Sequence, residues 1–283
     1  YLQWFWIRSL FNRSSNFIVL TIIGSASALS LIIILQLVGL VPHSLHGYGV
    51  LSQPFTSSGL LLISLFIALA YRERISHRLL LTLLLLLQVI AIIALGQLSA
   101  WFGLVIGLVI YAVITKKLTL KRCLIAALVL SLSLFAITIL SPRVAKKIQR
   151  LSSVEHIITS NSMQLRLQLW QQNYSAWLEK PIAGITKVIP YNNLTHVHNI
   201  YFQQLVEGGL LKFIVWLSFY LAIGFYLVKN MGQGLAAYLA AYLAISVEGL
   251  LENWWGDAEV LSLFLIMVIL ARSYVAEKKK NDI

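Results

Sequence analysis

Charged residues are scarce in this chain. They make up 11% of the 283 residues, whereas soluble domains carry roughly 25%. Apolar residues make up 59%. This composition excludes an ordinary soluble enzyme, a disordered tail and a nucleic-acid-binding domain. It is typical of a protein that crosses a membrane several times.

Cysteine is almost absent and acidic residues are few. The single cysteine, Cys123, excludes an internal disulfide framework and a cysteine-based zinc site. Ten Asp and Glu against 22 Lys and Arg give a formal net charge of +12. In a membrane chain such cations mark cytoplasmic connections rather than a nucleic-acid partner. The chain begins with Tyr1 and without a signal-peptide pattern, so we expect an upstream part.

Long runs of apolar residues dominate the sequence. A helix needs about 20 such residues to cross a hydrocarbon core of ~30 Å. We therefore predict an all-α integral membrane protein. Close helix packing is predicted by small residues at four-residue spacing, which are Gly103 and Gly107, and Ala236, Ala240 and Ala244. The eight predicted spans are 17–41, 54–71, 79–96, 98–115, 123–141, 211–228, 233–251 and 258–274.

The charges between the spans predict their orientation. Lys and Arg gather in every second connection and at both ends, whereas the connections 42–53, 97 and 252–257 contain none. The long connection 142–210 breaks this pattern with seven, but long loops can cross the membrane despite positive charge. The positive-inside rule then places both termini in the cytoplasm. Residues 1–141 would carry five spans, 142–210 a long outer loop, and 211–283 three spans with a basic tail.

The loop at 142–210 is too long to be structureless, so we expect it to contain helices and the function. After Pro142, cations that include Arg143 and Arg150 share one side of a short helix that would lie on the membrane surface. A second helix is predicted from about residue 162 to 180, and a third from near 198 into the next span. The stretch 182–197 between them is irregular.

Two histidines in this loop could carry chemistry. His196 and His198 would point the same way from an extended chain. His198 also lies at a helix start, where the positive end of the dipole favours neutral imidazole, the form that a general base needs. A hydrogen bond to a neighbouring carbonyl explains the same spacing. A metal site with His43 and His46 is a third interpretation.

Arg166 shares a helix face with Trp170 and Trp177. The tryptophans could form an interfacial belt, or stack on sugar or prenyl groups while the guanidinium binds phosphate. Glu248 and Glu252 raise a different hypothesis, a transporter with both carboxyls on an ion or proton path. For Glu252, Asp257 and Glu259 we expect a solvated rim instead.

Four short motifs in the loop carry a resemblance to a known family. They are Arg166-Leu-Gln-Leu-Trp170, Lys180-Pro181-Ile-Ala-Gly184, His198-Asn199-Ile-Tyr201 and Glu207-Gly-Gly209. Together they resemble the O-antigen ligase and polymerase superfamily of the bacterial inner membrane. The resemblance implies transfer of a glycan from a polyprenyl-pyrophosphate carrier to a glycan or lipid acceptor, without metal, cofactor or nucleic acid. It also implies residue roles: His198 as catalytic base, Arg166 as pyrophosphate ligand, and Asn199, Trp170 and His196 as further substrate-binding residues.

Two positions depart from the family pattern. Lys212 stands where a second glycine is expected after Gly209, and residues 97–101 lack the arginine that the family often has at the start of that span. With that arginine missing, the resemblance implies Arg143 or Arg150 as the second cation of the site. The same departures leave open a catalytically degenerate homologue.

Overall fold

The computed structural model describes residues 2–42, 51, 54–116, 135, 137–139, 142–150, 153, 161–192, 194–231 and 234–281. Within these ranges the regular structure is helical, and the one isolated β-bridge joins Tyr191 and Leu194. The predicted all-α class is confirmed for this part of the chain.

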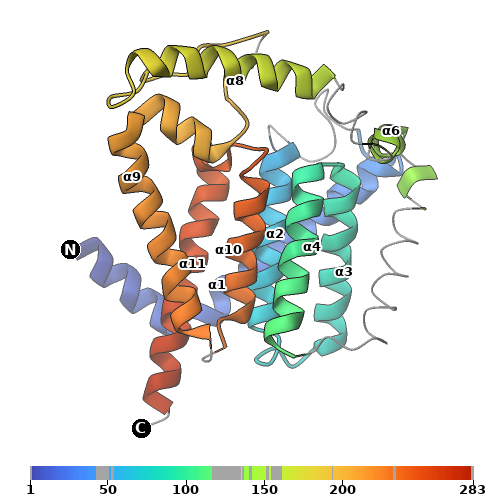
Figure 1. Ribbon diagram of the computed structural model, residues 1–283. Helices are drawn as coiled ribbons and strands as arrows, with labels where there is room; N and C mark the ends of the chain where they lie inside the picture. The colour runs from blue at the N-terminus through green and yellow to red at the C-terminus, as the bar shows by residue number, and fades with distance from the viewer. Residues whose placement is uncertain are drawn as a thin grey trace.

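Seven helices of the described part form a bundle (Figure 1). The centre of the bundle is α10, which packs mainly against α4 and α2, while α1 packs against α3 and α2. The helices are α1 (Leu2–Leu37), α2 (Pro54–Ala70), α3 (Arg78–Leu95), α4 (Leu98–Ile114), α9 (Ile200–Lys229), α10 (Ala236–Glu248) and α11 (Ala258–Asn281).

Within the described ranges, four segments are long and apolar enough to cross a membrane: Ser15–Leu37, Arg78–Leu95, Ile200–Lys229 and Ala258–Lys280. The helices α2, α4 and α10 are apolar but shorter. The outer side of α9 exposes large apolar side chains, among them Leu211, Val215 and Phe225, which suits contact with lipid. The chain is thus a multi-pass membrane protein. The fifth predicted span, 123–141, lies largely outside the described residues, so eight spans remain a prediction.

The small residues noted in the sequence bring α4 and α10 together. A Cβ added to Gly103 would lie 2.6 Å from the carbonyl oxygen of Ala244, and one added to Gly107 would lie 3.0 Å from the Ala244 Cβ. Only glycine permits backbones to approach this closely. The predicted role of these glycines in helix packing is confirmed.

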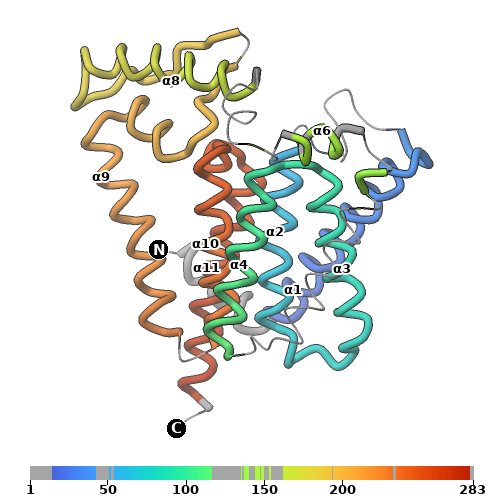
Figure 2. Tube along the Cα trace, turned by 45° about the vertical axis from the view of Figure 1, so that its right-hand side comes forward, coloured from blue at the N-terminus to red at the C-terminus, as the bar shows by residue number. Residues whose placement is uncertain are grey.

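The two ends of the bundle differ. Two helices of the 142–210 segment, α6 (Pro142–Arg150) and α8 (Asn161–Glu179), lie at one end, and α8 crosses above the start of α9 (Figures 1 and 2). Both occupy positions where the sequence predicted helices. At the opposite end Arg74 pairs with Glu277 at 2.8 Å. The connection after α2 therefore meets the basic end of α11 far from α8.

Aromatic side chains join α9 to the bundle near α8. Trp216 stacks on Tyr220 with ring centroids 5.3 Å apart, and Tyr220 contacts Tyr242 of α10 at 4.8 Å. Trp254, in the short 3₁₀ turn η2 (Trp254–Gly256), donates its indole N–H to the Ile245 carbonyl at 2.8 Å. These contacts fix the turn after α10 beside the start of α9, and this junction positions the candidate site.

Candidate active site

Two glycines dock the turn after α8 onto a kink in α9. Gly209 interrupts α9 with φ 66° and ψ −176°, and Gly184 has φ 76°. A Cβ on Gly184 would lie 2.4 Å from the Gly209 nitrogen. The Leu210 N–H donates to the Pro181 carbonyl at 2.9 Å across the same contact. The Lys-Pro-x-x-Gly and Glu-Gly-Gly motifs therefore form one backbone junction.

The tryptophan-rich face of α8 covers the core of the loop. Leu169, Val188, Val197 and Val206 form a buried cluster, with Trp170 and Trp177 packed against it. The face therefore packs on the core of the loop, and the two roles that the sequence suggested for the tryptophans stay predictions.

Polar side chains on the same face hold the irregular stretch before His198. The buried Asn173 amide accepts a hydrogen bond from the Ile189 N–H at 2.8 Å and donates to the Ile189 carbonyl at 3.0 Å. Trp170 donates its indole N–H to the Val197 carbonyl, while the Val197 N–H donates to the Gln203 side chain at 3.0 Å. The residue before His198 is thus held on both sides.

His198 itself adopts a left-handed backbone conformation with φ 50°. This region is uncommon for a residue with a Cβ, and its occurrence at functional sites is well known. The next residue, Asn199, caps α9 by accepting from the Phe202 N–H at 2.9 Å, and donates to the Leu250 carbonyl at 3.0 Å. The turn after α10 is therefore hydrogen-bonded to the residue beside His198.

Glu252 lies in that turn and contacts His198 and Arg166, the base and the pyrophosphate ligand that the resemblance implies. One carboxylate oxygen lies 3.0 Å from Nδ1 of His198, and the other accepts a hydrogen bond from the Arg166 guanidinium at 3.2 Å. The Glu252 side chain is 7% exposed, against 20% for Arg166 and 21% for His198. The expectation of a solvated rim is wrong for Glu252, because the turn folds back under α8.

The carboxylate determines which nitrogen of His198 is free. A carboxylate can only accept, so in the neutral form of the ring Nδ1 carries the proton and Nε2 keeps its lone pair. This is the arrangement of a histidine general base held by an acid. Sequence reasoning missed Glu252 because 54 positions separate it from His198. The available hint was that four of the ten acidic residues fall within 248–259.

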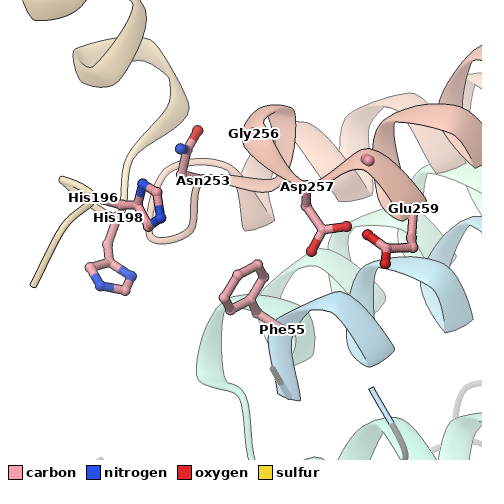
Figure 3. A pocket seen from close by; sticks show the side chains of 8 residues that line it. Phe55, His196, His198, Asn253, Gly256, Asp257 and Glu259 are labelled. Atoms are coloured by element: carbon pink, nitrogen blue, oxygen red, sulfur yellow. The ribbon is translucent and has the colours of Figure 1, made fainter. Parts of the chain in front are cut away.

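A cavity of about 360 Å³ adjoins His198 (Figure 3). The two histidines lie on one side of it, Asp257 and Glu259 on the other, and Phe55 from the start of α2 lies between them. Partial burial lowers the pKa of His196, and neighbouring His198 lowers it further. The lining residues are Phe55, His196, His198, Asn253, Gly256, Asp257, Ala258 and Glu259.

The carboxyls near the cavity differ in their partners. Asp257 caps α11 by accepting from the Val260 N–H at 3.1 Å, and it also accepts from the Thr56 hydroxyl. Glu248 is fully buried and accepts from the Ser58 hydroxyl at 2.6 Å. Glu259 is exposed, as expected of a rim, and has no ion pair or hydrogen bond among the described residues.

Several expected site residues lie elsewhere or beyond the described residues. The polar groups of Asn199 and Trp170 have partners within the protein, and Trp170 also lines a second hollow, of about 280 Å³, with Gln171, Tyr174 and Phe202. The side chains of Arg143 and Arg150 on α6 are outside the described part, and so are His43 and His46. Among the described residues no three His, Cys, Asp or Glu side chains gather as a metal site would require.

The site thus belongs to a multi-pass membrane protein in which a helical segment at one end of the bundle carries an Arg–Glu–His cluster. The family model described as O-antigen ligase matches residues 81–217, a range that includes both Arg166 and His198. Together with the loop motifs, this match confirms the resemblance to the O-antigen ligase and polymerase superfamily over that range. No curated protein matches the chain.

Proposed function

We propose that this protein transfers a glycan from a polyprenyl-pyrophosphate carrier to an acceptor hydroxyl on a glycan or lipid, in surface polysaccharide biosynthesis. The observation that carries the proposal is the shared contact of Arg166 and His198 with Glu252. It unites an anion-binding group and a base beside a cavity. The family match supports the reaction class.

The proposed reaction needs one base and one stabilised leaving group. The acceptor oxygen bonds to the anomeric carbon, the bond from that carbon to the pyrophosphate oxygen breaks, and polyprenyl pyrophosphate leaves with the electron pair. Nε2 of His198 takes the hydroxyl proton, a contribution of about 10²–10⁴-fold in rate. In-line attack inverts the anomeric centre. The sugar is already activated by pyrophosphate, so the reaction as written uses no metal or nucleotide.

Arg166 is the proposed ligand of the leaving pyrophosphate. Its planar guanidinium can donate two parallel hydrogen bonds to phosphate oxygens, and a fixed cation stabilises the charge that grows there. In the free protein Glu252 occupies this guanidinium at 3.2 Å. The pyrophosphate would therefore displace the Glu252 carboxylate from Arg166, or bind to the guanidinium beside it.

The carrier lipid would reach the site from the bilayer. The exposed apolar side of α9 leads towards α8, and cations on α6, among them exposed Lys146, would attract a diphosphate to that end. We place the protein in the bacterial inner membrane with this end in the periplasm and both termini in the cytoplasm. Arg143 and Arg150 remain candidates for a second phosphate ligand.

The transporter hypothesis has one observation in its favour, the fully buried carboxyl of Glu248. Its other residue, Glu252, is held by Arg166 and His198. Substrate flux into liposomes that contain the protein, without glycan transfer, would favour transport. Inactivity of the pure protein with every donor would instead favour a degenerate homologue.

The test is glycan transfer by the protein reconstituted in liposomes. His198→Ala should abolish transfer of a polyprenyl-pyrophosphate-linked glycan, and Arg166→Lys should lose most of it because an ammonium cannot bind phosphate with two parallel bonds. His77→Ala, an exposed histidine between α2 and α3, is the matched control and should retain full activity. Full activity in His198→Ala would defeat the proposal.

Deletion of the gene distinguishes ligase from polymerase. Surface-glycan gels that lose the long chains while carrier-linked polymer accumulates would indicate a ligase. Gels in which single repeat units remain on the acceptor would indicate a polymerase.

A further inference from the structure

The cavity beside His198 differs in charge from the Arg166 side of the cluster. Arg166 does not line it, and neither Lys nor Arg is among the described residues that do. Its charged lining consists of the carboxyls of Asp257 and Glu259. A diphosphate would be repelled there, because like charges in a partly buried site interact unfavourably. The cavity therefore suits the other reactant, the acceptor.

The remaining lining residues have the chemistry that binds a sugar. Phe55 places a half-buried ring between the histidines and the carboxyls, and an aromatic face can pack on the C–H face of a pyranose (Figure 3). Carboxylate oxygens accept hydrogen bonds from hydroxyls, and those with a charged acceptor are the stronger ones. An apolar platform with a few placed polar groups is the usual composition of a small-molecule site.

Glu259 and Asn253 retain hydrogen-bonding capacity in this cavity. Both oxygens of Asp257 already have partners within the protein, whereas Glu259 has none among the described residues. Asn253 is 8% exposed, and its side-chain oxygen is buried without a partner among the residues that the structure describes. A buried unpaired acceptor is costly unless a ligand or water satisfies it.

We infer that this cavity binds the terminal sugar of the acceptor, and that the sugar is one without a negative charge. Phe55 packs on its ring, Glu259 accepts from its hydroxyls, and its attacking hydroxyl lies beside His198. The volume of about 360 Å³ is at the lower end of the range for small-molecule sites, about 300–1,000 Å³, so it holds a terminal unit rather than a long glycan. This inference rests on the proposed glycan transfer.

Kinetics with three acceptors test it. The full chain in nanodiscs receives a polyprenyl-pyrophosphate-linked glycan and lipid-anchored acceptors that end in glucose, glucosamine or glucuronic acid. We expect wild type to use glucose and glucosamine and to discriminate against glucuronic acid. Glu259→Gln should raise the KM for the glucose acceptor about tenfold, as for loss of a charged hydrogen bond, and should reduce discrimination against glucuronic acid. The KM for the donor should not change.

Two further variants separate a specific effect from a folding defect. Phe55→Ala should raise the KM for the acceptor, and Phe55→Tyr should restore it because the ring is kept. Phe102→Ala, on the exposed side of α4, is the matched control and should change neither KM. If wild type transfers glycan but Glu259→Gln and Phe55→Ala leave the acceptor KM and the discrimination unchanged, the acceptor subsite is wrong. If wild type transfers nothing, the proposed function fails first.

Discussion

Glu252 accepts a hydrogen bond from Nδ1 of His198 at 3.0 Å, although the two residues are 54 positions apart. The pair forms because the turn after α10 is tied to the start of α9, where the Ile200 N–H donates to the Gly249 carbonyl at 2.9 Å. A buried carboxylate at this distance orients the imidazole and stabilises the imidazolium that forms when the base takes a proton. In the proposed reaction Glu252 would therefore act through His198 as a positioning residue.

Replacing Glu252 by Gln should lower kcat for glycan transfer by about 10²-fold or more, within the range of general-base catalysis. Glutamine keeps the shape and can still accept from Nδ1, but it removes the charge that stabilises the imidazolium. The measurement is the initial rate at saturating donor and acceptor. Glu73→Gln, an exposed acid between α2 and α3, is the control and should behave as wild type. An unchanged kcat in Glu252→Gln would show that the carboxylate does not assist His198.

Local sequence patterns predicted the helices well and the cluster only in part. The predicted spans 54–71, 79–96 and 98–115 differ from α2, α3 and α4 by at most one residue at each end, because each is one apolar run between polar breaks. The predicted surface helix after Pro142 and the helix near 162–180 correspond to α6 and α8 for the same reason: hydrophobic periodicity and caps are local.

The contact partners of the site could not be predicted from such patterns. Glu252 looked solvated because it follows the last apolar residues of its span, and no periodicity indicates that the turn folds back on His198. Phe55 is the second residue of a predicted span, and nothing in the sequence indicated that it faces the loop. Both positions depend on how segments far apart in the sequence pack together. Such contacts produce no regular spacing of residues along the chain.

Gly209→Ala should destabilise the loop. The backbone of Gly209 has φ 66° and ψ −176°, and a Cβ there would lie 2.1 Å from the Ile182 carbonyl oxygen. The conformation alone costs a residue with a side chain on the order of 1–3 kcal/mol, so the melting temperature in detergent should fall by several degrees. Gly24→Ala is the control, since a Cβ on Gly24 in α1 meets nothing within 4 Å. Equal melting temperatures for the two variants would refute the close contact.

Asn173→Ala should loosen the stretch that leads to His198. Its amide makes two hydrogen bonds with the backbone of Ile189, at 2.8 and 3.0 Å. Loss of the amide leaves buried backbone groups unpaired, at about 1–3 kcal/mol. Hydrogen exchange in peptides that cover 182–197 should become about tenfold faster or more. Gln168→Ala, on the exposed side of α8, should leave the exchange unchanged. If both variants exchange alike, Asn173 does not hold the stretch.

The Arg166–Glu252 ion pair predicts opposite effects of one substitution on binding and turnover. In the free protein Glu252 is an anion 3.2 Å from the guanidinium, so it competes with the pyrophosphate of the donor. Glu252→Gln removes this competitor and should tighten the binding of undecaprenyl pyrophosphate severalfold, even though the same variant turns over slowly. Binding to protein in nanodiscs, measured with and without Arg166→Lys in the same chain, separates the causes: the gain should disappear when Arg166 is also replaced. A gain that persists without Arg166 would mean that the pyrophosphate binds elsewhere, and weaker binding in Glu252→Gln would mean that the carboxylate helps to hold Arg166 in its binding geometry.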